Sequence, residues 1–273
     1  MTSDQFPKLV PETYRWQTSK TSPRTIKRRA IGTEAWVGIK DENYKGQYDL
    51  FLDTTLRVRE NPLEMPLSLA SLRTAITTAL VELRFEHPEC AGTATWDQQG
   101  PVLQYTAPES THDALSWAEA AIELWLTANT GLQIRKEIGR RRKEPDSIFA
   151  GHAKSLTVHL VADVPEEDAP LVSGATVDIL LHMNHIYWDG ISARMFLGSL
   201  LRKLGPNLDN DHKLKQFDWG KETKNISEPV LDASKVDITS LGKDFEDARD
   251  EFMESLMAFA VRTYDLELLP PEI

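Results

Sequence analysis

The sequence predicts an α/β (α+β) protein in which a mixed, mostly antiparallel sheet is flanked by helices. Segments rich in strand-forming residues alternate along the chain with segments whose apolar residues recur every three or four positions. One continuously apolar segment, residues 175–183, is typical of a central strand. The chain has 273 residues, of which 41% are hydrophobic and 27% are charged, so it can bury a substantial core.

The N-terminal part of the chain predicts an arm, a strand, a helix and a hairpin. Residues 1–30 contain three prolines and a basic cluster, and we expect an irregular arm there. Strand-forming residues predict a strand over 47–58. Apolar residues on one helical face predict a helix over 68–86. Two short strand-like segments, 92–97 and 101–107, predict a hairpin.

The middle of the chain predicts two more helices and two more strands. Apolar periodicity predicts a helix over 113–127. The strongest charge run, 134–146, predicts an exposed loop, with a local site for an anionic ligand such as a nucleotide phosphate as the alternative. Residues 154–162 and 175–183 predict strands, and a helix is expected over 191–204, ended by the Gly-Pro pair that follows.

The C-terminal part is polar before it recovers helical periodicity. We expect a long crossover over 206–242 and a helix over 243–264. The resulting division is an arm at 1–30, a lobe at 31–205, and a crossover segment with a C-terminal helix at 206–273.

Charge, cysteine content and hydropathy exclude several function classes. The 31 Lys and Arg residues against 42 Asp and Glu give a net charge of -11, which disfavours nucleic acid or anionic membranes as partners. The single cysteine, Cys90, excludes an intrachain disulfide and a cysteine-based metal cluster. No apolar run is long enough to span a bilayer, and residues 1–5 are not an apolar signal segment. We therefore expect a cytoplasmic protein.

The sharpest chemical feature lies where the strand at 175–183 gives way to the next helix. His185 stands at the strand end, where a neutral imidazole can take a proton from a hydroxyl or amine. Asp189 is expected to cap the helix or pair with an arginine, and Gly190 to permit a backbone reversal. Tyr187 and Trp188 are candidate substrate-binding residues, with core packing as the alternative for Trp188. A structural histidine is the alternative for His185.

This pattern resembles the His-x-x-x-Asp-Gly signature of the chloramphenicol-acetyltransferase-like superfamily. That superfamily includes plant BAHD acyltransferases, condensation domains of nonribosomal peptide synthetases and fungal trichothecene-type O-acetyltransferases, of which the fungal branch is the most similar. The element order over residues 30–204, with Phe85-Glu86-His87-Pro88 at a helix end, is similar to the N-terminal lobe of that fold. The resemblance implies that His185 is the general base, that Asp189 is structural, and that Gly190 leaves room for substrate.

The resemblance also implies a reaction and its partners. We expect O-acetyl or O-acyl transfer from a CoA or carrier thioester to a hydroxyl of a secondary metabolite. Acyl-CoA is then a co-substrate, the acceptor is a small molecule, and no metal is required. Members of the superfamily have two lobes with the active site between them, whereas 83 residues follow Gly190 here. We therefore expect the second lobe to come from another chain or from a second copy.

Two other functions remain open on the sequence alone. A lobe that acts by itself would be adapted to a different natural-product reaction, such as cyclisation or dehydration, with His185 again as a base. A lobe without catalysis would be a binding module whose exposed apolar face seeks a partner.

Overall fold

The computed structural model describes residues 10–35, 37, 49–59, 67–97, 100–142, 154–208, 214–233, 235, 247, 250, 251, 254 and 255. The chain forms two compact units, Met1–Pro229 and Val230–Ile273. All strands described below belong to the first unit. In the described part of the second unit, residues 230–233 form the short helix α6 (Val230–Ala233).

The central sheet of the first unit has four strands in the order β3-β8-β7-β6. These are β3 (Leu50–Arg57), β8 (Thr176–Met183), β7 (Leu156–Ala162) and β6 (Ile122–Leu126). β8 pairs antiparallel with both of its neighbours, and β6 pairs parallel with β7. The predicted mixed, mostly antiparallel sheet is therefore confirmed, and β8 holds the central position that its continuous apolar sequence predicts.

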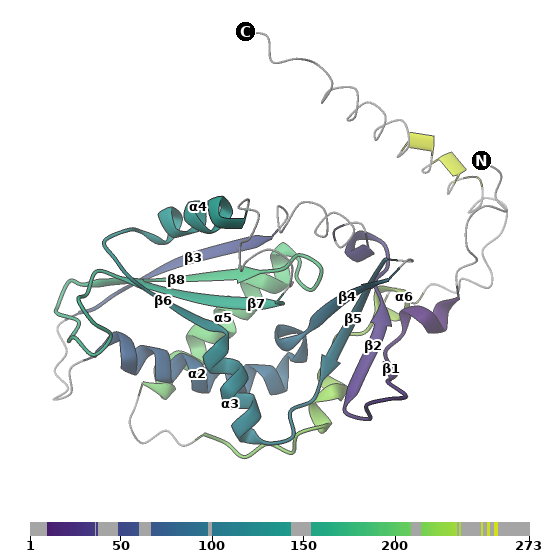
Figure 1. Ribbon diagram of the computed structural model, residues 1–273, viewed down its shortest axis with the longest axis horizontal. Coiled ribbons are helices and arrows are strands. Elements are labelled where there is room, and N and C mark those ends of the chain that lie inside the picture. The colour runs from purple at the N-terminus through teal and green to yellow at the C-terminus, as the bar shows by residue number, and fades with distance from the viewer. Residues whose placement is uncertain are drawn as a thin grey trace, which may run out of the picture. The chain divides into compact units, whose positions relative to one another are not determined.

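Two long helices cover one face of this sheet (Figure 1). α2 (Leu69–Glu86) and α5 (Gly190–Asn207) pack against each other, and their buried apolar residues form one cluster with the inward residues of β7 and β8. α2 begins with a capping box between Ser68 and Ser71, which satisfies the first free backbone N–H groups of the helix. This layer is the core of the protein, because it contains most of the fully buried leucine and isoleucine side chains.

A second, fully antiparallel sheet has the order β1-β2-β5-β4. It contains β1 (Gln17–Thr18), β2 (Thr25–Arg29), β5 (Gly100–Thr106) and β4 (Thr93–Asp97). The predicted hairpin is confirmed as β4 and β5. The expectation of an irregular arm over residues 1–30 is corrected for its last part, because β2 pairs with β5 along five residues.

Salt bridges explain why a strongly basic segment is ordered there. The Arg29 guanidinium pairs with both carboxylate oxygens of Asp97 at 2.8 Å, across the sheet. Arg28 pairs in the same bidentate way with Glu34 at 2.6 Å. Planar guanidinium–carboxylate pairs of this kind fix geometry as well as charge. The boundary between arm and lobe near residue 30 stays a prediction.

The helix predicted over 113–127 is correct only in its first half. α3 (Thr111–Ala120) ends early, and the next residues form β6, the strand at the sheet edge. The apolar residues of this segment fit either period, and pairing with β7 from Ile122↔Val158 onward decides the outcome. Because parallel strands need a long crossover, usually a helix, this pairing requires a helix between β6 and β7.

That crossover helix is α4 (Gly131–Arg142), which replaces most of the exposed loop predicted over 134–146. α4 lies on the sheet face opposite α2 and α5 (Figure 1). Its Ile134 and Ile138 are buried against Val161 and Leu180 of the sheet. Most of the other described residues of the helix are charged or polar, so a buried stripe of one isoleucine per turn runs through the basic segment. Residues 143–146 lie outside the described residues.

The remaining predictions have mixed outcomes. The strands over 47–58, 154–162 and 175–183 and the helix over 68–86 are confirmed as β3, β7, β8 and α2. α5 continues through Gly205 and Pro206 to Asn207, so the expected stop there is wrong by one turn. A proline in the last turn removes one hydrogen bond only, which the helix tolerates at its end.

The polar crossover contains a short 3₁₀ turn at Lys221–Asn225, and the helix predicted over 243–264 lies largely outside the described residues. Of the helices that the structure describes, none is long and apolar enough to cross a bilayer.

The packing of α4 gives a direct test of this fold. Ile138→Ala is expected to lower the free energy of unfolding by about 2–4 kcal/mol, because it leaves a cavity under the helix. Lys136→Ala, on the exposed side of the same helix, is expected to change it by less than about 0.5 kcal/mol. Denaturant unfolding measures both. Equal values for the two variants would mean that α4 does not pack on the sheet.

Candidate active site

His185 lies in a tight turn directly after β8, within the motif turn of residues 184–189. Its side chain is half-buried, between the exposed start of α5 and the buried end of the strand. Asn184, 3% exposed, builds the turn: its side-chain Oδ1 accepts a hydrogen bond from the Ile186 N–H at 2.8 Å. The Asn184 carbonyl accepts from the Tyr187 N–H at 3.1 Å. Asparagine favours such local bonds, so it sets the direction in which the chain leaves the strand.

Ser155, the residue just before β7, holds the motif turn at both ends. Its carbonyl accepts from the Asn184 N–H at 3.1 Å, which extends the β7–β8 ladder by one step beyond Leu156↔Met183. The indole N–H of Trp188 lies 2.8 Å from Ser155 Oγ and 3.1 Å from its carbonyl oxygen. The Ser155 hydroxyl donates in turn to the Glu89 carbonyl at 2.5 Å. The residues before and after His185 are thus fixed to the same buried serine.

Asp189 caps α5, one of the two roles expected for it. Its Oδ1 accepts from the backbone N–H groups of Ile191 at 2.8 Å and Ser192 at 2.7 Å. The Ser192 hydroxyl accepts from the Asp189 N–H at 3.0 Å, which completes a capping box. The pKa of Asp189 is lowered below its usual value, chiefly by the hydrogen bond from the Ser192 N–H. The Ser192 hydroxyl, the Ile191 N–H and the charge of His185 act in the same direction, and partial burial acts against them.

Gly190 needs a corrected explanation. The expected backbone reversal would require a positive φ, and Gly190 does not have one. A Cβ at this position would also meet no atom of the chain within 4 Å. Neither strain nor crowding within this chain therefore explains the glycine. The space beside it is open at the surface that carries His185.

The side chains of Tyr187 and Trp188 lie in different surroundings. Trp188 is 6% exposed and packs edge-on against Phe196 of α5 at 4.9 Å, so the structure favours core packing for it. Tyr187 is half-buried and lies against Gly92. A Cβ on Gly92 would come within 2.7 Å of the Tyr187 ring, so this glycine makes the space that the tyrosine occupies.

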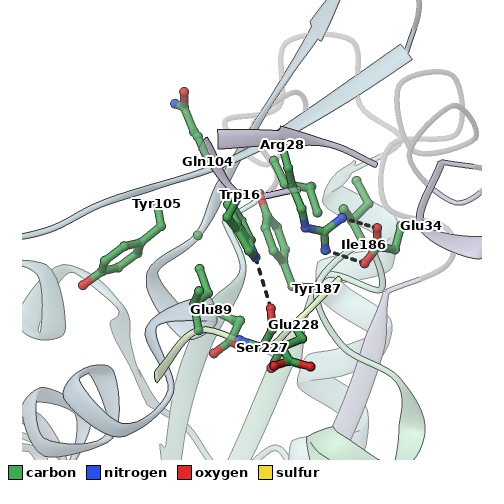
Figure 2. Close-up of a pocket in the computed structure, with 13 residues that line it drawn as sticks. Trp16, Arg28, Glu34, Glu89, Gln104, Tyr105, Ile186, Tyr187, Ser227 and Glu228 are labelled. Atoms are coloured by element: carbon green, nitrogen blue, oxygen red, sulfur yellow. Dashed lines mark hydrogen bonds and ion pairs between the residues drawn. The ribbon is translucent and has the colours of Figure 1, made fainter. Parts of the chain in front are cut away.

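A small cavity adjoins the motif turn on the side of Tyr187 (Figure 2). Its volume is about 90 Å³, and Ile186 and Tyr187 form part of its wall. Trp16 stands across from them, with the guanidinium of Arg28 4.9 Å from its ring centre. The cavity has room for roughly three waters, whereas pockets for drug-sized ligands reach about 300–1,000 Å³. His185 is not among its lining residues, so it does not hold the acceptor of a reaction at His185.

Three residues that shape this site, Asn184, Ser155 and Gly92, were not predicted from the sequence. Asn184 was detectable, since asparagine after a strand signals a turn. Ser155 and Gly92 carry no local signal, because each acts on the motif turn from a distant part of the chain.

Comparison with known proteins places the chain among fungal acetyltransferases. A family model described as 15-O-acetyltransferase Tri3 matches residues 6–271. The trichothecene O-acetyltransferase TRI3 of Trichoderma arundinaceum is 45% identical over 254 residues, which cover 92% of this chain and 49% of that protein. The trichothecene 15-O-acetyltransferase TRI3 of Fusarium sporotrichioides is 38% identical over 259 residues, which cover 94% of this chain and 49% of that protein.

The solved structure of the Fusarium sporotrichioides protein matches with a TM-score of 0.85 over 94% of this chain and 50% of that chain. These matches confirm the resemblance to the fungal trichothecene-type branch and the predicted fold class. The chain spans about half the length of the curated relatives it matches.

The cap on α5 gives a prediction with a defined pH dependence. Asp189→Ala is expected to cost about 1 kcal/mol of unfolding free energy at pH 7, and Asp189→Asn much less, because asparagine also caps helices. A carboxyl whose pKa is lowered by folding stabilises the protein above its ordinary pKa of about 4, and this contribution is lost as the pH falls through the lowered value. In denaturant titrations, the difference in unfolding free energy between the native protein and Asp189→Ala is therefore expected to become smaller below pH 4. A constant difference from pH 7 to pH 3 would contradict this cap.

Proposed function

The chain belongs to the Tri3 family of 15-O-acetyltransferases, and from this we propose that it is the His185-bearing half of an enzyme that acetylates a trichothecene hydroxyl. The observation that carries the proposal is the half-buried imidazole of His185 on a rigidly held turn, in a chain that the family model matches from residue 6 to 271. The names of the relatives supply the acceptor class, a trichothecene alcohol. The donor is an acetyl thioester, with acetyl-CoA as the first candidate.

The proposed reaction needs one base and no metal. His185 takes the proton of the acceptor hydroxyl as that oxygen attacks the thioester carbonyl. The carbon–sulfur bond then breaks, and the imidazolium returns the proton to the departing thiolate. The products are an ester and a free thiol, and His185 is regenerated. The anchors at Ser155 and Asp189 hold the turn on both sides of the base, which preserves the reacting geometry.

Two neighbours of His185 have proposed supporting roles. Gly190 keeps open the surface beside the base, because no atom of this chain lies where its Cβ would be. Contact of Tyr187 with the substrate stays a prediction from the sequence, because its ring lines the small cavity rather than the surface beside His185. Location of the enzyme in the cytoplasm stays a prediction from the sequence.

We further propose that a second lobe completes the acceptor site. The cavity beside the motif turn is far smaller than a tricyclic alcohol requires, and the relatives are twice as long as this chain. The first turns of α5, directly after the motif, expose Ile191 at 74% and Met195 at 69%. Large apolar side chains exposed on adjacent turns are typical of a surface that another polypeptide covers. A second copy of this chain is the other partner that the sequence left open.

The role of His185 is tested in the assembled enzyme with acetyl-CoA and a trichothecene alcohol. His185→Ala is expected to lower kcat roughly 100- to 10,000-fold, the usual contribution of a general base. His112→Ala removes an exposed histidine at the start of α3 and is expected to leave kcat unchanged. Release of free CoA measures the rate.

Full activity of His185→Ala would exclude the general-base role. No thioester consumption by the unaltered assembly would instead favour a lobe adapted to cyclisation or dehydration, or a binding module.

The second-lobe contact is tested by binding. The probe is a separately produced polypeptide that spans the half of the Fusarium sporotrichioides relative not covered by this chain. Ile191→Arg with Met195→Arg is expected to raise its Kd at least about tenfold, because two buried apolar side chains contribute roughly 1.5–3 kcal/mol each. Val172→Arg is the matched control, since Val172 is 68% exposed but lies before the opposite end of β8.

Calorimetry measures the three Kd values. An unchanged Kd for the α5 variant, or an equal loss for Val172→Arg, would exclude this contact surface. Sedimentation of the chain alone shows whether a second copy takes the place of the lobe.

A further inference from the structure

A row of polar side chains crosses the sheet face that α4 covers. It contains Asp49, His182, His159 and Glu123, which follow the strand order β3-β8-β7-β6 from one edge to the other. We call these four residues the polar row. His159 is fully buried and His182 is 7% exposed, and apolar residues such as Leu180 and Val161 lie beside them on this face. Buried imidazoles in such a layer need an explanation, because burying polar groups is costly unless they are paired.

Contacts along the polar row are continuous. Asp49 Oδ2 lies 2.5 Å from His182 Nε2. The rings of His182 and His159 are stacked, with centroids 5.8 Å apart and planes 18° from parallel. Glu123 pairs directly with His159 across the β6–β7 ladder, and its Oε2 lies 3.3 Å from His159 Nδ1.

The same Nδ1 atom of His159 has a second neighbour. The indole N–H of Trp125, two residues after Glu123 on β6, points at it from 3.1 Å. These two contacts exclude each other. Without a proton, Nδ1 accepts from Trp125 and has nothing to donate to Glu123. With a proton, it donates to Glu123 and can no longer accept from Trp125.

The other ring nitrogen of His159 does not settle the choice. In the part of the chain that the structure describes, His159 Nε2 is buried without a hydrogen-bond partner. The two arrangements therefore differ in the partner of Nδ1, while the surroundings of Nε2 are the same in both.

We propose that His159 is a proton-controlled switch between the two partners that β6 presents to it. When the ring is neutral, Trp125 donates to Nδ1. When a proton from solvent adds to Nδ1, the Trp125 bond breaks and a new Nδ1–H bond to the Glu123 carboxylate forms. The switch goes beyond the proposed acetyl transfer and does not depend on it.

Charged groups around the ring set the pH of the switch. Glu123 favours the added proton, and the hydrogen bond from His159 keeps the pKa of Glu123 below its usual value, against the effect of its burial. The cations of α4 oppose it: Arg141 lies 5.0 Å from the Trp125 ring and Arg135 lies 5.4 Å from the ring of Phe51. The other charged or titratable groups on the elements packed around this face are His182, Asp178, Asp49, Asp53, Glu137, Arg140 and Lys154.

The switch changes the contact between α4 and β6, the strand at the sheet edge. In the neutral state, the Trp125 indole is fixed by His159 on one side and covered by the Arg141 guanidinium of α4 on the other. In the protonated state the Trp125 indole N–H has lost its acceptor, while the Glu123 carboxylate accepts a hydrogen bond from His159.

Nitrogen-15 NMR of the tryptophan indoles tests the switch in the unaltered protein. The Trp125 indole resonance, identified by its loss in Trp125→Phe, is expected to move upfield as the pH falls from 8 to 5. The Trp188 indole is the internal control, because it donates to Ser155 and has no titrating partner. Its resonance is expected to stay in place.

Two variants separate the switch from general pH effects. Glu123→Gln changes a side chain that is 36% exposed and removes the carboxylate that favours the proton. The midpoint of the Trp125 titration is therefore expected to fall by at least about 0.5 pH unit, roughly a threefold change in proton affinity. His159→Gln is expected to abolish the titration. A Trp125 resonance that does not move with pH, or an unchanged midpoint in Glu123→Gln, would overturn the proposal. Both readouts are spectroscopic, so inactivity of the enzyme would not affect them.

Discussion

The extension of the β7–β8 pair through Ser155 is the interaction on which the rest of the site depends. The ladder between these strands continues one residue past β8, and the same serine then binds the indole of Trp188. His185 lies between these two points, so the sheet and the Trp188 indole hold the backbone on both sides of it. Asp189 adds a third anchor by starting α5. The candidate base, although it lies in a turn, is thereby tied to the central sheet, as pre-organised catalysis requires.

The two faces of the central sheet serve different purposes. The face under α2 and α5 is apolar and supplies the core that supports the motif turn. The face under α4 contains the polar row, whose imidazoles and carboxylates are the groups of the proposed switch. Both faces meet at β8, whose residues alternate between them. One strand therefore carries the candidate base at its end, core residues on one side, and His182 on the other.

The family and the length of the chain bear on the open surface beside His185. A Tri3-family chain half as long as its relatives presents a well-ordered motif turn next to exposed apolar residues of α5. Gly190 lies between them, and a Cβ placed on it would meet none of the described atoms within 4 Å. These features support the proposed second surface over His185. The cavity next to the motif turn is far smaller than a pocket for a drug-sized ligand.

The sequence by itself determined the fold class, the central position of β8, the helix α2 and the motif around His185, because these depend on local pattern: apolar period, turn residues and a capping aspartate. Tertiary structure decided the rest. Residues 122–126 fit a helix or a strand equally well, and only pairing with β7 made them β6, which in turn required α4 within the charge run. Ser155 became an anchor and His159 a shared partner only when distant strands met. Local sequence patterns indicate which face of an element is apolar, but they do not indicate which distant atoms will complete its hydrogen bonds.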